Sequence, residues 1–256
     1  MKGEPQRISS RDNALLVRLR KLAQDPGGYR KLGEVWLEGD HLCAALLARG
    51  RRPVHSVVTE SGWDEPRLRE LAIAADRVAL VPDALFKSFS GLESPARIGF
   101  VLMHGGSADI ESGVASVVLD RLQDAGNVGS ILRSAAALGF GQVIALKGTA
   151  ALWSPKVLRA GMGAHFALRL IESVASEVLN ALQLPLVATS SHATQALHQV
   201  ALPRPCAWVF GHEGQGVDAG LLERCALTVR IPQPGGEESL NVAAAAAICL
   251  YESARQ

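Results

Sequence analysis

The chain has 256 residues, of which 48% are hydrophobic and 20% are charged, and its net charge is +1. This composition excludes a disordered protein and leaves enough apolar material for one large or two ordinary domains. No apolar run approaches the ~20 residues that span a bilayer, and the polar N-terminus lacks the apolar stretch of a secretory signal. We therefore expect a cytoplasmic protein that does not bind membranes.

Charge is distributed unevenly along the chain. Residues 1–100 carry 16 Lys and Arg against 13 Asp and Glu, whereas residues 101–256 carry 10 against 12. The basic front part is suited to binding phosphates, but a solvated helix face explains the same charges equally well. The four cysteines are scattered, and His192 and His198 have no partner at ligand spacing, so no metal site is predicted.

The first hundred residues predict a small α/β domain. Residues 13–24 have the pattern of an amphipathic helix, with Leu15, Leu19 and Leu22 on one side. Further strands are expected at 34–38, 54–59, 77–81 and 97–103, and further helices at 39–50, 65–75 and 83–89. A polar segment rich in Gly and Ser follows, so we predict a domain over 1–103 and a linker over 104–113.

A second alternation of strands and helices fills residues 114–256, the predicted second domain. Strands are expected at 116–119, 142–146, 167–171, 186–189, 207–210 and 228–231, and helices at 128–138, 175–182, 219–223 and 242–252. Short apolar strands that alternate with helices predict a mostly parallel sheet with helices on both faces. Ligands of such sheets bind beyond the carboxyl ends of the strands.

The first motif, residues 127–133, reads Asn-Val-Gly-Ser-Ile-Leu-Arg and follows the predicted strand 116–119. Asn127 could cap the helix, which is its ordinary structural interpretation. Ser130 and Arg133 share a helix face and could hold a phosphate. Asn127 and Arg133 are six residues apart and do not share a face, so a common site needs another segment. A dinucleotide site is disfavoured, because the turn lacks Gly-x-Gly and no carboxylate follows at 145–150.

The second motif, residues 211–216, reads Gly-His-Glu-Gly-Gln-Gly and follows the predicted strand 207–210. Its glycines allow close approach of the backbone to a ligand, although an ordinary tight turn would look the same. Glu213 could order the neighbouring loops, and His212 is kept out of the site. The third motif, residues 231–242, is a Pro/Gly loop that leads into a helix, for which Ser239 is a suitable N-cap.

Together and in this order, the three motifs resemble those of the SpoU/TrmH family of RNA 2′-O-ribose methyltransferases. Residues 34–46 and 89–95 are similar, more loosely, to the N-terminal RNA-binding domain of family members, which is like ribosomal protein L30e. The resemblance implies a C-terminal α/β domain with a parallel sheet and a trefoil knot, joined to a smaller α/β L30e-like domain. It also implies a homodimer.

The resemblance further implies the residues of the site. Catalytic and RNA-binding roles fall on Arg133, Asn127, Glu213, Ser239 and Asn241. S-adenosylmethionine would be held by Thr189, Gly211, Gly214, Ile231 and Leu240. Ala243 stands where many members have a small polar residue, which removes one secondary contact.

The expected function is S-adenosylmethionine-dependent methylation of a ribose 2′-hydroxyl in structured RNA, with rRNA favoured over tRNA. No metal is needed, since the sulfonium makes the methyl group electrophilic. The alternative from another class is a non-catalytic RNA- or ribosome-binding protein of the same fold. The intact polar residues of the three motifs favour the enzyme.

Overall fold

The computed structural model describes residues 4–236 and 239–256, which form two compact units. The first unit extends to Gly106 and includes Trp153–Phe166, and the second consists of Ser107–Leu152 and Ala167–Gln256. The predicted domain limits remain a prediction. The segment Trp153–Phe166, which those limits assign to the C-terminal part, lies in the first unit.

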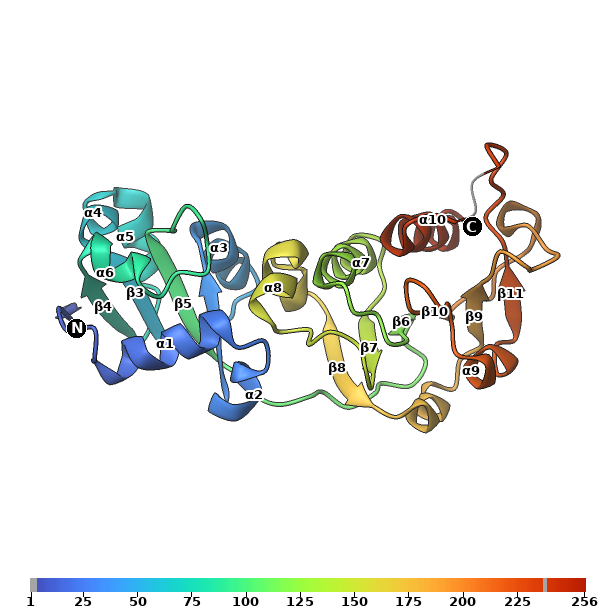
Figure 1. Ribbon diagram of the computed structural model, residues 1–256, viewed down its shortest axis with the longest axis horizontal. Coiled ribbons are helices and arrows are strands. Elements are labelled where there is room, and N and C mark those ends of the chain that lie inside the picture. Colours follow the sequence, from blue (N-terminus) through green and yellow to red (C-terminus); the bar gives the residue numbers. More distant parts are fainter. Residues whose placement is uncertain (1–3, 237–238) are drawn as a thin grey trace. The chain divides into compact units, whose positions relative to one another are not determined.

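The first unit contains a mixed sheet with the strand order β1-β4-β3-β5-β2 (Figure 1). Strand β5 is antiparallel to its neighbours β2 and β3, and the other pairs are parallel. The strands are β1 (Gln6–Arg7), β2 (Glu34–Glu38), β3 (His55–Thr59), β4 (Arg77–Val81) and β5 (Ile98–Met103). The helices are α1 (Ala14–Gln24), α2 (Gly28–Leu32), α3 (Asp40–Ala48), α4 (Glu60–Asp64), α5 (Pro66–Ala72), α6 (Asp83–Lys87), α8 (Pro155–Gly161) and the 3-10 turn η1 (Ala164–Phe166).

Helix α1 shows how local sequence signals build this unit. Its N-cap is Asn13, whose side chain accepts a hydrogen bond from the backbone N–H of Leu15 at 3.0 Å. The predicted leucine stripe is buried, and Leu16 is buried beside it. Helix α8 was not predicted, although Ser154 as N-cap and Pro155 at the first helical position are ordinary signals of a helix start.

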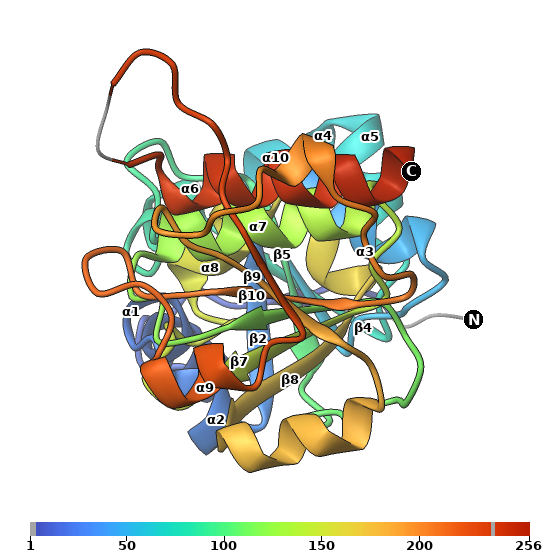
Figure 2. The same cartoon turned by 90° about the vertical axis from the view of Figure 1, so that its right-hand side faces the viewer.

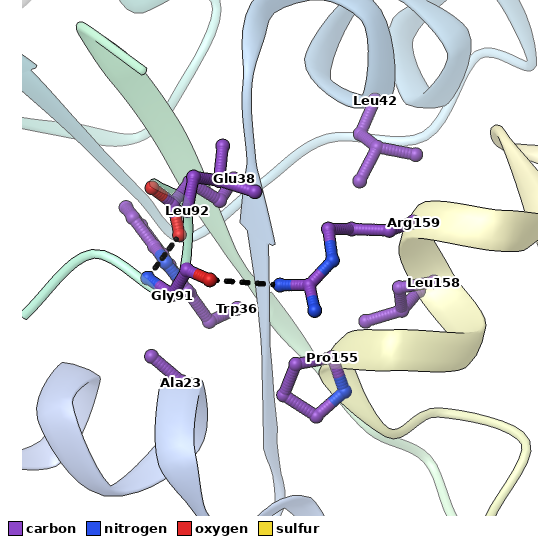
Figure 3. Close-up of a pocket in the computed structure, with 9 residues that line it drawn as sticks. All are labelled: Ala23, Trp36, Glu38, Leu42, Gly91, Leu92, Pro155, Leu158 and Arg159. Carbon is purple, nitrogen blue, oxygen red and sulfur yellow. Dashed lines mark hydrogen bonds between the residues drawn. The ribbon is translucent and has the colours of Figure 1, made fainter. Parts of the chain in front are cut away.

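A small cavity lies within the first unit (Figure 3). It is lined by Ala23, Trp36, Glu38, Leu42, Gly91, Leu92, Pro155, Leu158 and Arg159. The carboxylate of Glu38 accepts from the N–H of Gly91 at 3.0 Å, and Arg159 donates to the carbonyl of Gly91 at 3.1 Å. The cavity volume is about 20 Å³. This is room for one water molecule and is far too small for a nucleoside.

The second unit contains a sheet of six strands among the described residues, in the order β11-β9-β10-β6-β7-β8, and every pair is parallel. The strands are β6 (Ser116–Leu119), β7 (Gln142–Leu146), β8 (Arg169–Val174), β9 (Leu186–Thr189), β10 (Ala207–Phe210) and β11 (Leu227–Val229). The helices are α7 (Ala125–Ala137), η2 (Ser176–Leu182), η3 (Leu197–Gln199), α9 (Ala219–Glu223) and α10 (Val242–Arg255), of which η2 and η3 are 3-10 helices. The predicted α/β fold with a parallel sheet is confirmed.

Helices cover both faces of this sheet, as expected for parallel strands (Figure 2). Helices α7 and α10 lie side by side on one face, whereas α9 and η2 lie on the other. The face under η2 and α9 packs through one apolar cluster, which includes Val118, Ile144, Leu179 and Leu221. The predicted knot remains a prediction.

The strand order creates a switch point beside β6. From β6 the chain continues to β7 and β8 on one side, and later returns to β10 on the other side. The loops that follow β6 and β10 therefore leave the same edge of the sheet in opposite directions. In an open parallel sheet, ligands usually bind at the edge where loops diverge in this way.

In the part of the chain that the structure describes, no helix is both long enough and apolar enough to cross a membrane.

One buried hydrogen bond between the sheet and α10 gives a test of this packing. The indole N–H of Trp208 donates to the hydroxyl of Ser253 at 2.8 Å, and both side chains are buried. We expect Ser253→Ala to lower the free energy of unfolding by about 1–3 kcal/mol, because the indole N–H stays buried without a partner. Urea unfolding measures this, with the exposed Ser191→Ala as a control. Equal stability of the two variants would contradict the prediction.

Candidate active site

A chain of hydrogen bonds joins the three motifs at the carboxyl edge of the second sheet. The carboxylate of Glu213, in the loop after β10, accepts from the side-chain amide of Asn127 at 3.2 Å. The amide oxygen of Asn127, in the first turn of α7, accepts from the amide of Asn241 at 3.0 Å. Asn127 therefore contacts two other segments, whereas the predicted common site of Asn127 and Arg133 remains a prediction.

Asn127 is available for this bridge because another residue caps α7. The side chain of Asp124 accepts from the backbone N–H of Asn127 at 2.7 Å, so Asp124 is the N-cap and α7 begins at Ala125. The expectation that Asn127 caps the helix, and that the helix begins at Val128, was therefore wrong. With its backbone satisfied, Asn127 has its whole amide group free for contacts with other segments.

Glu213 fastens the second motif to the segment that precedes α7. Besides Asn127, its carboxylate accepts from the backbone N–H groups of Gln123 at 3.3 Å and Asp124 at 3.1 Å. Partial burial acts to raise the pKa of the Glu213 carboxyl, but the hydrogen bonds to the carboxylate outweigh it, so the pKa is lowered from its ordinary value. Glu213 is thus held as an ionised acceptor.

Asn241 has two roles at the start of α10. Its side-chain oxygen accepts from the backbone N–H groups of Ala243 at 2.9 Å and Ala244 at 3.3 Å, which makes Asn241 the N-cap. The expectation that Ser239 caps this helix was wrong, because Asn241 stands next to the first helical residue. Ser239 is exposed, and no hydrogen bond joins its side chain to the described residues. The motif's Glu237 and Glu238 lie outside the described residues.

Arg133 lies on the exposed side of α7 together with Ser130, as the three-residue spacing predicts. No hydrogen bond or ion pair joins Arg133 to residues 4–236 or 239–256. With respect to the described residues, its guanidinium is therefore available for an anionic ligand. The structure does not bring Arg133 into the hydrogen-bond chain of Glu213, Asn127 and Asn241.

The second motif is a closed loop that requires its first glycine. A Cβ on Gly211 would lie 2.1 Å from the backbone of Gly216 and Val217, so no other residue fits. Inside the loop, Nδ1 of His212 accepts from the N–H groups of Gly214 at 3.0 Å and Gln215 at 3.3 Å. His212, which the sequence analysis left out of the site, therefore shapes the loop that contains Gly214.

Two further predicted cofactor residues lie at neighbouring strand ends. Strands β9 and β11 are parallel, with Thr189 paired to Val229, so Thr189 and the segment that leads to Ile231 emerge side by side. Leu240 is 39% exposed just before α10. The loop closed on Gly211 and these strand ends offer backbone N–H and C=O groups with little side-chain bulk, which fits the adenosine part of a ligand such as S-adenosylmethionine.

Sequence reasoning missed two residues at the end of β6, Asp120 and Arg121. Asp120 is buried, and its carboxylate accepts two hydrogen bonds from the guanidinium of Arg121. A carboxylate directly after an apolar strand, at the edge of the sheet where ligands bind, was the available signal. Among residues 4–236 and 239–256, no group of three or more His, Cys, Asp or Glu side chains is arranged to hold a metal ion.

Comparison with known proteins decides the family. The sequence model of the SpoU rRNA methylase family matches residues 115–251, more than half of the chain. The chain belongs to this family. The matched range contains all three motifs.

Individual relatives are similar to this chain over most of its length. The chain is 35% identical to an uncharacterized tRNA/rRNA methyltransferase of Synechocystis, slr1673, over 97% of this chain and 93% of that protein. It is 30% identical to the 23S rRNA (guanosine-2′-O-)-methyltransferase RlmB of Bordetella pertussis, over 86% and 96%. The solved structure of the SpoU methyltransferase AviRb from Streptomyces viridochromogenes, in complex with AdoMet, aligns with a TM-score of 0.85 at 25% identity, over 95% of this chain and 98% of that one.

These findings confirm the predicted family, the class of enzyme and the cofactor. The chain is an S-adenosylmethionine-dependent RNA 2′-O-ribose methyltransferase of the SpoU family. The roles of the individual site residues remain predictions.

The lowered pKa of Glu213 predicts a pH-dependent difference in stability. We expect Glu213→Gln to be less stable than the wild type at neutral pH, because the ionised carboxylate is the better acceptor for its donors. The difference should disappear as the pH falls below the ordinary range of Glu and through the lowered pKa, where the wild-type carboxyl becomes protonated. Thermal unfolding between pH 7 and pH 3 measures it, with the exposed Glu223→Gln as a control. A difference that is independent of pH would contradict the prediction.

Proposed function

We propose that the second unit binds S-adenosylmethionine at the carboxyl edge of its sheet and methylates a ribose 2′-hydroxyl of rRNA there. The observation that carries the proposal is the hydrogen-bond chain from Glu213 through Asn127 to Asn241. It joins three segments distant in sequence into one polar cluster beside the switch point. No purely structural need of the helices explains it, since each helix already has its own cap.

The cofactor would be held by backbone groups at Gly211, Gly214, Ile231 and Leu240, with Thr189 at the adjacent strand end. When bound, S-adenosylmethionine supplies a methyl carbon that its sulfonium makes electrophilic. The loop that closes tightly on Gly211 would form one wall of this site. A wall formed by backbone atoms needs no side-chain ordering when the ligand binds.

The chain's own task is to align the ribose with this methyl group. We assign Arg133 to the phosphate beside the target ribose, where its guanidinium also stabilises negative charge on the attacking oxygen. Arg133 is a poor general base, because a guanidinium stays protonated at neutral pH. Asn127, Asn241 and Ser239 supply polar contacts around the ribose, and Glu213 holds Asn127 in place. Most of the rate would come from positioning.

The substrate is proposed from the relatives. The family name and RlmB of Bordetella pertussis both point to rRNA, whereas the Synechocystis relative's name leaves tRNA open. The first unit is proposed to bind RNA, which agrees with the excess of Lys and Arg in residues 1–100. Action on rRNA would place the protein in the cytoplasm.

We also propose a homodimer formed through α10. Ile248 is 42% exposed and Tyr251 is 59% exposed, and they are three residues apart on one face of this helix. Large apolar side chains on one exposed helix face are typical of an interface between protein chains. Leu240, 39% exposed, precedes the same helix, so this interface would lie near the site.

Transfer of labelled methyl from S-adenosylmethionine to rRNA and to tRNA tests the function. We expect label in rRNA, and a rate lower by about 10²-fold or more in Arg133→Ala, because the charge that orients the phosphate is lost. The matched control is Arg169→Ala, at the amino end of β8, where an exposed pair with Glu111 contributes little.

Two outcomes would change the proposal. Label in tRNA alone would show that the substrate is tRNA and not rRNA. If neither RNA is labelled and calorimetry detects no binding of S-adenosylmethionine, the proposed enzymatic function is contradicted. The alternative, a non-catalytic RNA-binding protein, would then remain.

Sedimentation tests the dimer. We expect the wild type to sediment as a dimer at micromolar concentration, and the double variant Ile248→Asp, Tyr251→Asp to sediment as a monomer, because two charges would be buried in the interface. Val178→Asp, an exposed position on η2 on the other face of the sheet, is the control. A monomeric wild type would contradict the proposal.

A further inference from the structure

The loop of the second motif is tied to the end of β6 by the ion pair of Asp120 and Arg121, of which only Asp120 is buried. The Asp120 side chain is 4% exposed, and its two oxygens accept from Nε and Nη2 of Arg121 at 3.0 and 3.1 Å. The same carboxylate accepts from the backbone N–H of Asp218 at 2.7 Å. The carboxylate therefore holds both Arg121 and the far end of the loop 211–218.

Arg121 extends this contact to the loop itself. While Nε and Nη2 face Asp120, Nη1 donates to the side-chain oxygen of Gln215 at 3.2 Å. Hydrogen bonding to Asp120 raises the pKa of the Arg121 guanidinium, against the opposing effect of burial. Only the planar fork of a guanidinium can serve two directions in this way, because a lysine offers a single point charge.

The backbone conformation of Arg121 lets its side chain reach both Asp120 and Gln215. Arg121 has a φ of 59°, a left-handed conformation that is uncommon for a residue other than glycine. Its side chain lies against Gly148, where a Cβ would come within 3.2 Å of the Arg121 Cγ. A strained backbone that persists at a functional edge indicates that the surrounding contacts hold it there.

We propose that Asp120 and Arg121 are positioning residues for cofactor binding, which act by clamping the loop 211–218 in its binding shape. The inference rests on the proposed function, since that loop contains Gly211 and Gly214. Glu213 fixes the loop to the first motif through Asn127, whereas the clamp of Asp120 and Arg121 fixes it through Gln215 and Asp218. Loss of the clamp should therefore weaken binding of S-adenosylmethionine and leave the chemical step largely unchanged.

A double-mutant cycle on Arg121→Lys and Gln215→Ala tests the clamp. We expect each single variant to raise the Kd for S-adenosylmethionine, measured by calorimetry without RNA, roughly tenfold, as expected for one lost hydrogen bond to a charged group. The KM for S-adenosylmethionine should rise in parallel, and kcat should change less than twofold. The double variant should bind no more weakly than either single one, because both remove the same contact.

Other results would overturn the inference. Additive effects in the double variant would show that the two side chains act separately. A rise in the KM for RNA alone would make Arg121 an RNA contact instead, and an unchanged Kd in both single variants would show that the ion pair is only structural. Asp120→Asn serves as a further variant only if its melting temperature stays close to that of the wild type.

The calorimetric measurement separates this inference from the proposed function. If the wild type binds S-adenosylmethionine but methylates no RNA, the proposed reaction fails while the clamp is still tested by the Kd values. If the wild type binds no S-adenosylmethionine, both fail. Arg169→Ala, which leaves the ion pair intact, should match the wild type in Kd.

Discussion

The parallel pairing of β6 with β10 is the constraint on which the rest of the site depends. Leu119 pairs with Phe210 although more than 80 residues separate them, and the two strands end at the same edge. The first motif follows β6 and the second follows β10, so this pairing brings them together. Helix α10, packed beside α7, adds the third motif. Without this register, the three motifs would not lie close together.

Short polar side chains convert this proximity into a defined geometry. Glu213, Asn127 and Asn241 each come from a different segment, and each bond in their chain joins two of them. Since Asn127 is in the first turn of α7 and Asn241 begins α10, two of the three side chains are fixed by helices. A site built on such elements holds its geometry better than one built on loops alone.

Two carboxylates at this edge have different tasks. Glu213 contacts the first motif and accepts hydrogen bonds from backbone and side-chain amide groups. Asp120 is buried, and its negative charge is neutralised by Arg121. A buried carboxylate without such a partner would be strongly destabilising. The loop 211–218 is therefore held from two sides, and its glycines can shape a binding wall without making the loop mobile.

The sequence by itself determined most of the strands, and its motifs indicated the family. The bounds of β2, β4, β6, β7, β9 and β10 are those predicted, because each is a short apolar run enclosed by turn residues. The three motifs predicted the segments of the candidate site for the same local reason. The choice of caps was wrong, because several polar residues precede α7 and α10 and each can cap a helix.

Only the tertiary structure decided that Asp124 caps α7 so that Asn127 can bridge to Glu213 and Asn241, and that Arg121 reaches Gln215. The bonds of Asn127 with Glu213 and Asn241, and the bond of Arg121 with Gln215, join residues 86 to 114 positions apart, and no local pattern encodes such a pairing.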